Sequence, residues 1–349
     1  MSSSMTAFFA TAQQITIRYI ESSVFALGVI GSLLNVILFS RRQLRMNSCC
    51  SYFFTSSLAA LVLLSMGIIP LIYAQFYSPN PYFSINGFCK IRAYVNQVSA
   101  MSCRWLLTMA SIDRCAACTT NVNIRRLCSV KIARRIAIVL VIIWMILPIH
   151  TLIFFNILPP SNIACRITNN DMAMYHAIYT IVMGGTLPVL IMLICTVFIW
   201  RNLKKKNQRR AVINVVQVTR RTDKRDQQIV VILLAQVTIF VVSTIPFMAN
   251  NLYSAVTRSV PNKSADRIAI ESFLQVITEL FVYIFPAVSF YSNTLVSRTF
   301  RKELIKMTEW FRLFHGRKQR HIHPNTQTRT NEILLNTMNN RTSPAIINQ

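Results

Sequence analysis

Long apolar runs constrain the fold of this chain more than any other feature. A run of about 20 apolar residues crosses a bilayer as a helix. Helices are expected because lipid offers no hydrogen-bond partner to exposed backbone groups. The runs cover approximately residues 18–41, 51–75, 87–115, 132–156, 174–200, 227–252 and 269–296. The expected fold is therefore an all-α membrane protein, a bundle of seven transmembrane helices.

The composition favours a membrane protein over a soluble enzyme. Hydrophobic residues make up 53% of the 349-residue chain and charged residues 14%, whereas a soluble domain carries about 25% charged residues. The sequence has no histidine pair at metal-ligand spacing, no glycine-rich phosphate loop and no nucleophile elbow. We therefore predict that the chain is not an enzyme and needs neither a metal nor a cofactor.

The net charge of +26 is concentrated in alternate loops. The basic clusters lie at residues 41–45, 125–135 and 201–225 and in the segment after residue 297. Positively charged loops stay in the cytoplasm, which predicts an extracellular N-terminus, a cytoplasmic C-terminus and an odd number of spans in the plasma membrane. We interpret the basic charge as topology and attraction to the anionic lipid bilayer, and expect no nucleic-acid partner.

The same pattern divides the chain into four parts. Residues 1–17 are expected to be an extracellular N-terminus, 18–296 the transmembrane domain, 297–315 an amphipathic surface helix, and 316–349 a disordered cytoplasmic tail. Asn262 begins a glycosylation sequon in the last predicted outer loop. Cys89 and Cys165 are the two cysteines on the oxidising side. They are expected to form a disulfide, the alternative being two free thiols.

Short motifs stand in order along the runs. GSLLNVILF contains Asn35, and WLLTMASIDRC ends with Asp113 and Arg114. Further motif positions are Trp144, Pro148, Pro188, Phe240, Pro246 and Pro286. Together these motifs resemble the rhodopsin-like (class A) G protein-coupled receptors over about residues 20 to 312. The chain is most similar to the peptide-binding branch and to its divergent invertebrate members.

The resemblance implies a receptor with an extracellular ligand, a heterotrimeric G protein partner and possible arrestin binding at the tail. It also implies that Asp113, Arg114 and Asp226 form an inactive-state ionic lock between the third and sixth helices. The alternative is a generic charge pair at a membrane boundary.

Four positions depart from the family pattern: Val62, Thr244, Thr196 and Phe285. Val62 replaces the second-helix aspartate, so we expect no sodium site of the family type. The position of the seventh-helix tyrosine is ambiguous between Ser289 and Tyr291. These departures leave a non-signalling receptor or scaffold as the alternative function, and a transporter as a more distant one.

Two charged residues stand out inside the apolar runs, Arg104 in the third and Glu279 in the seventh. Intramembrane charges are candidate functional sites. Arg104 and Glu279 either pair with each other, or Glu279 meets a cationic group of the ligand. The other candidate ligand residues are Gln97, His176, Asn250, Tyr253 and Gln275. The segment YVNQVSAM lacks the aspartate of monoamine receptors, and the seventh run has no lysine for retinal, so neither a monoamine nor retinal is expected. The resemblance to the peptide-binding branch implies a neuropeptide-like ligand.

Overall fold

The structure is a computed structural model that describes residues 2–77, 84–119, 121–157, 165–212, 217–257, 260, 263–298, 300–307 and 309. The side chains of residues 2, 3, 43 and 203–229 lie outside this description. The chain forms two compact units, Met1–Phe300 and Arg301–Gln349. In the second unit, residues 301–307 are helical; the rest of the predicted surface helix and the tail lie almost wholly outside the described residues.

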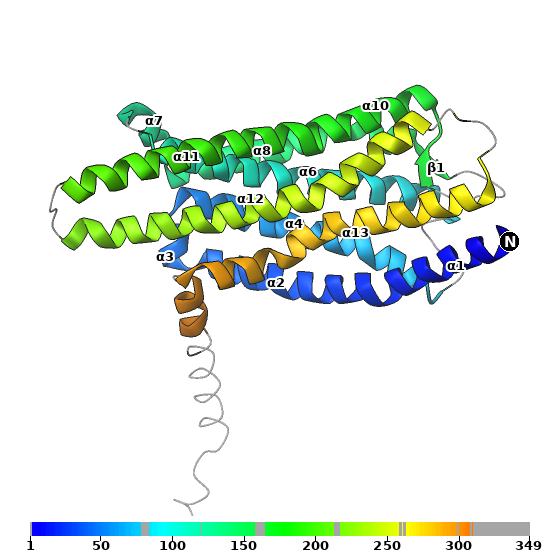
Figure 1. The fold of residues 1–349 in the computed structure, drawn as a ribbon, viewed down its shortest axis with the longest axis horizontal. Coiled ribbons are helices and arrows are strands. Elements are labelled where there is room, and N and C mark those ends of the chain that lie inside the picture. Colours follow the sequence, from blue (N-terminus) through cyan, green and yellow to red (C-terminus); the bar gives the residue numbers. More distant parts are fainter. Residues whose placement is uncertain are drawn as a thin grey trace, which may run out of the picture. The chain divides into compact units, whose positions relative to one another are not determined.

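The first unit is almost entirely helical (Figure 1), as the sequence predicts. Its first half contains α1 (Ser2–Ile15), η1 (Thr16–Glu21), α2 (Ser22–Ser40), α3 (Arg42–Arg45), α4 (Ser48–Ala74) and α6 (Asn86–Ala117). Its second half contains α7 (Val122–Leu127), α8 (Val130–Ile146), α9 (Ile149–Phe154), β1 (Phe155–Ile157), β2 (Cys165–Ile167), α10 (Asn170–Ile181), η2 (Val182–Thr186), α11 (Leu187–Val212), α12 (Gln217–Thr257) and α13 (Ala265–Val296).

The first transmembrane helix is longer than the sequence predicts. α1, η1 and α2 follow one another without a break, and α1 packs against α13. The rings of Phe9 and Phe273 meet at a centroid distance of 5.6 Å. η1 is a π-helical turn, a geometry that is frequent at functional sites. Residues 2–17 of the predicted extracellular segment are thus helical and run directly into the first predicted span.

Six helical segments of the described chain are long and apolar enough to cross a membrane. The one predicted span that is not among these six is the third, residues 87–115, which corresponds to α6. This helix is long enough to cross a membrane but carries several charged residues, so its hydropathy is lower. It packs against α4, α8 and α11, and buries Arg92, Arg104, Asp113 and Arg114. Because its charged side chains are covered by protein rather than lipid, α6 fits inside a membrane bundle.

Close packing holds the bundle together. A Cβ atom on Gly28 would come within 3.0 Å of the Ala287 Cβ, so α2 and α13 touch along a small-residue contact. A second group of buried side chains joins Leu64 of α4 to Cys103 of α6 and Tyr283 of α13. Large apolar side chains such as Ile138 and Ile142 of α8 point outward, as expected for a surface that faces lipid.

The two ends of the bundle differ. Figure 1 places the N-terminus and β1 at one end, and α3 and α7 at the other. β1 pairs antiparallel with β2. The basic residues of α3 and α7 therefore lie at the end opposite the N-terminus, which agrees with the topology predicted from charge.

Candidate functional site

The last turns of α6 carry a buried ion pair. The Arg114 Nε donates to Asp113 Oδ2 over 3.0 Å, and Nη2 of the same guanidinium also contacts that oxygen. Both residues are less than a tenth exposed. An ion pair with so little water nearby is stable only if the remaining polar atoms also find partners. A further partner of both residues lies at the start of α4.

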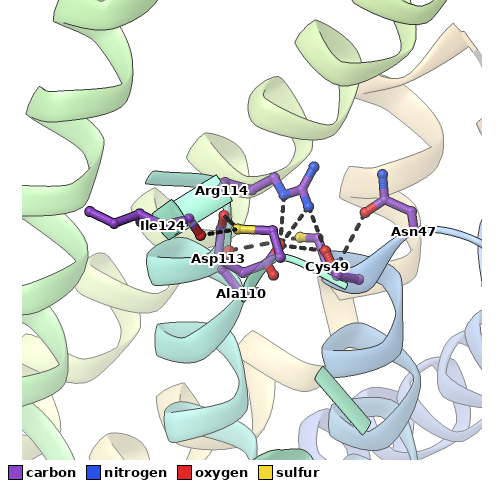
Figure 2. Close-up of polar contacts among 8 residues, drawn as sticks. Asn47, Cys49, Ala110, Asp113, Arg114 and Ile124 are labelled. Atoms are coloured by element: carbon purple, nitrogen blue, oxygen red, sulfur yellow. Dashed lines mark hydrogen bonds and ion pairs between the residues drawn. The ribbon is translucent and has the colours of Figure 1, made fainter. Parts of the chain in front are cut away.

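Ser48, the first residue of α4, completes the cluster (Figure 2). Its hydroxyl donates to Asp113 Oδ2 over 2.8 Å and accepts a hydrogen bond from Arg114 Nη2, also over 2.8 Å. The side chain of Asn47 caps α4 by accepting from the Cys49 backbone N–H. The cap fixes where α4 begins and so places Ser48 opposite the ion pair. Sequence reasoning missed Ser48, whose local sequence carries only the helix-cap signal.

Cys128 covers the cluster from the loop between α7 and α8. Its thiol donates to the Asp113 carbonyl oxygen over 3.4 Å. Burial raises the pKa of the Cys128 thiol to about 11, and the Asp113 carboxylate raises it further than Arg114 lowers it. The thiol is therefore neutral at physiological pH. It acts as a weak hydrogen-bond donor and not as a nucleophile.

Asp226, the third residue of the predicted lock, lies on α12. Its side chain is outside the described residues, so the bridge from the third to the sixth helix stays a prediction. The described partners of Arg114 come from α6 and α4.

A polar network crosses the same half of the bundle and was missed by the sequence analysis. The amide nitrogen of Gln236 on α12 lies 3.0 Å from the Ser289 carbonyl oxygen, 2.9 Å from Ser292 Oγ and 2.9 Å from Asn293 Oδ1. Asn35 of α2 lies 3.5 Å from both Ser289 Oγ and Asn293 Nδ2. The network therefore links the first, sixth and seventh transmembrane helices, with Asn35 at its edge.

This network borders a cavity of about 20 Å³, enough for one water molecule. Ser57 and Ala60 of α4 line it, together with Cys103 and Pro286. Val62 is 42% exposed, so placing Val62 at the interior position of the family aspartate was wrong. Helix α4 presents Ser57 and Ala60 there instead. Ser289 faces the network, whereas the Tyr291 hydroxyl donates to the Leu27 carbonyl, so Ser289 is the interior residue.

The remaining motif positions are mostly buried. Trp144 packs its ring 5.4 Å from Trp105, and Phe240 packs edge-on against Phe285 at the same centroid distance. Thr244 is 5% exposed, and the Thr196 hydroxyl finds no hydrogen-bond partner among the described residues. Pro188 lies in α11, and Pro246 and Pro286 lie inside α12 and α13.

At the opposite end, Cys89 and Cys165 are joined. They form a disulfide. The bond ties β2 to the start of α6. Asn86 adds a polar contact, because its Oδ1 accepts from the Ile157 backbone N–H of β1. The hairpin is thus fixed over the N-terminal end of α6.

The candidate ligand residues do not form one group. Asn250 donates to Gln275 Oε1, and Gln275 donates to Glu279 Oε1, each over 2.7 Å. The other three bond elsewhere. Gln97 donates to Thr180, His176 meets His150 across 3.0 Å, and Tyr253 donates to Glu271. The described structure therefore brings together Asn250, Gln275 and Glu279. Asn262 lies outside the described residues.

Arg104 and Glu279 are not paired. Arg104 Nη1 donates to the Gly184 carbonyl in η2 over 3.2 Å, and the guanidinium lies 5.9 Å from the centre of the Phe247 ring. The pairing of Arg104 with Glu279, one of two alternatives, is therefore wrong for the described residues. Arg104 instead joins α6 to the π-helical turn η2 of the fifth span and to α12.

A family comparison agrees with this geometry. The model of the 7 transmembrane receptor (rhodopsin family) matches residues 33–311, more than half of the chain. No curated protein matches the chain. The matched segment contains the Asp113–Arg114 pair, the cysteine pair and the network around Asn35. Members of this family are multi-pass membrane receptors and not enzymes. The chain belongs to the rhodopsin family of seven-transmembrane receptors.

Proposed function

We propose that this receptor binds an extracellular ligand and activates a heterotrimeric G protein at the end of the bundle that carries Arg114. The observation that carries the proposal is the buried cluster of Ser48, Asp113 and Arg114. Its hydrogen bonds hold a cation at the end of α6 and can be exchanged for contacts with a partner. An interaction of this kind between helices makes a bistable element.

The energies involved allow a bound ligand to open this cluster. A ligand shifts an equilibrium only by its difference in affinity for the two states. Hydrogen bonds to charged groups contribute about 1.5–3 kcal/mol each, which a ligand of ordinary affinity can offset. Opening of the cluster would free Arg114 for the G protein. An Asp226 bridge to the sixth helix would add to the same lock.

The proposed ligand is peptide-like and carries a cationic group. Glu279 is supported as its anchor because Gln275 supplies the only described hydrogen bond to that carboxylate, and because Arg104 does not neutralise it. The proposed location is the plasma membrane, with the N-terminus extracellular. The threonines and serine of the tail are proposed arrestin sites after phosphorylation, and lie outside the described residues.

The test is nucleotide exchange by a panel of G proteins in membranes that contain the receptor, its Arg114→Ala variant or its Asp226→Ala variant. We expect Arg114→Ala to abolish exchange and Asp226→Ala to raise it above the basal rate. Unchanged basal exchange in Asp226→Ala would remove that residue from the lock. Silence of all three proteins across the panel, with peptide mixtures present, would favour the non-signalling receptor or scaffold.

A further inference from the structure

Glu21 is a buried carboxylate in the first transmembrane span. It ends the π-helical turn η1 and is 0% exposed. Neither carboxylate oxygen has a hydrogen-bond partner among the described residues. A buried ionised carboxylate without a partner costs several kcal/mol, so Glu21 is protonated unless a bound cation compensates its charge. Sequence analysis did not single out Glu21, because it stands near the outer end of an apolar run.

The charged neighbours of Glu21 do not supply that group. Arg92 of α6 and Glu279 of α13 are the charged side chains that act on it. The Arg92 guanidinium donates to the backbone carbonyls of Met66 and Gly67, over 3.1 and 2.7 Å. None of its N–H groups bonds to Glu21, since both carboxylate oxygens lack partners. Ionisation of Glu21 beside Glu279 would therefore place two negative charges near the single positive charge of Arg92.

Two further side chains with oxygen atoms, Tyr283 and Asn96, belong to this group of interacting residues. Tyr283 of α13 interacts with Glu21, Glu279, Arg92 and the side chain of Asn96. The Asn96 Oδ1 atom is buried and has no hydrogen-bond partner among the described residues. Side chains from the first, third and seventh transmembrane helices therefore interact with one another in this region. Two of the side chains, Glu21 and Asn96, carry oxygens that are buried and unused.

We propose that Glu21, Glu279, Asn96 and Tyr283 form a binding site for a small monovalent cation. Carboxylate, amide and phenol oxygens are the ligands that hard cations prefer, and one monovalent cation would balance the charge that Glu21 gains on ionisation. Sodium and the ammonium head of an organic amine share this chemistry. Because Glu279 is also the proposed anchor of the ligand, the inference rests on and deepens that part of the proposed function. Its test uses neither the ligand nor a G protein, so it can fail while ligand-dependent nucleotide exchange is retained.

The test is the thermal unfolding midpoint of the full chain in lipid nanodiscs. The salt is sodium chloride, ammonium chloride or tetraethylammonium chloride, at constant ionic strength. Tetraethylammonium serves as the reference, because its nitrogen carries four ethyl groups and has no N–H to donate to the carboxylates. A cation at a few times its dissociation constant is expected to raise the midpoint by about 1–2 °C. A rise with sodium alone identifies a metal site, and an equal rise with ammonium identifies a site that also takes amine heads.

Glu21→Gln removes the charge and keeps the shape of the side chain. We expect the differences between salts to vanish in this variant and in Glu279→Gln, whatever the absolute midpoint. Glu271→Gln is the matched control, because Glu271 lies on α13 and already accepts from Lys263 and Arg267; it should keep the wild-type response. Equal wild-type midpoints in all three salts would overturn the site, as would a full response in Glu21→Gln. If one variant does not fold, the wild-type salts and the other variant still decide the question.

Discussion

The hydroxyl of Ser48, at the first residue of α4, donates a hydrogen bond to the carboxylate of Asp113, near the last turn of α6, over 2.8 Å. The same hydroxyl oxygen accepts from Arg114, so one small side chain binds both members of the ion pair. The start of the second transmembrane helix is thereby joined to the end of the third. A ligand-driven movement of α6 relative to α4 would have to break these bonds.

The first prediction concerns this contact. Ser48→Ala removes one donor from the buried Asp113 carboxylate, and the loss of a hydrogen bond to a charged group costs about 1.5–3 kcal/mol. We expect a lower unfolding midpoint together with a higher basal rate of nucleotide exchange. Ser51→Ala, one turn further along α4, is the control and should leave both unchanged. A Ser48→Ala receptor with the wild-type basal rate would show that the contact is only structural.

The second prediction concerns the reactivity of Cys128. Its pKa is raised from 9.0 to about 11. Only the thiolate reacts with alkylating reagents, so below pH 9 alkylation should be about 100-fold slower than for a thiol of pKa 9. The alkylation rate should rise with pH up to about 11. Any stability that the neutral thiol adds is present below pH 9 and is lost as the pH rises from 9 to about 11. Mass spectrometry of the alkylated peptide measures the rate, with the denatured chain as reference. A profile with its midpoint near 9 in the folded chain would contradict the burial of this thiol.

The third prediction tests the approach of α13 to α4. A Cβ atom on Gly67 would lie 2.6 Å from the hydroxyl oxygen of Tyr283, a ring that is 3% exposed. Overpacking of this kind costs about 1–3 kcal/mol, so Gly67→Ala should lower the unfolding midpoint. Gly87→Ala is the matched control, because a Cβ there meets nothing within 4 Å. Equal midpoints for the two variants would mean that Tyr283 does not pack where the structure places it.

The fourth prediction concerns the link between the sixth and seventh spans. Gln236→Leu keeps a similar volume but removes the amide that reaches Ser292 and Asn293. Each buried acceptor left without a donor costs about 1–3 kcal/mol. We expect α12 to separate more easily from α13, which raises basal nucleotide exchange. Thr238→Val is the control, since its exposed hydroxyl bonds only to the backbone of its own helix. A Gln236→Leu receptor with the basal nucleotide exchange and the unfolding midpoint of the wild type would argue against the network as a switch.

The sequence by itself determined the fold class and the family. Apolar runs, alternating basic loops and short motifs are local patterns, and each can be read without knowing how the helices pack. The pattern placed seven spans along the chain, and put Cys89 and Cys165 on the same side of the membrane. It also placed Asp113 and Arg114 where α6 ends.

The tertiary structure alone decided which side chains meet. A position along a helix does not fix the direction in which its side chain points, because the rotation of each helix is set by packing against its neighbours. Val62 was expected inside and faces outward, whereas Glu21 lies near the end of an apolar run and is buried. Arg104 binds Gly184 instead of Glu279. These contacts join residues far apart in sequence, so no local pattern records them, and the rotation and packing of the helices determine the site.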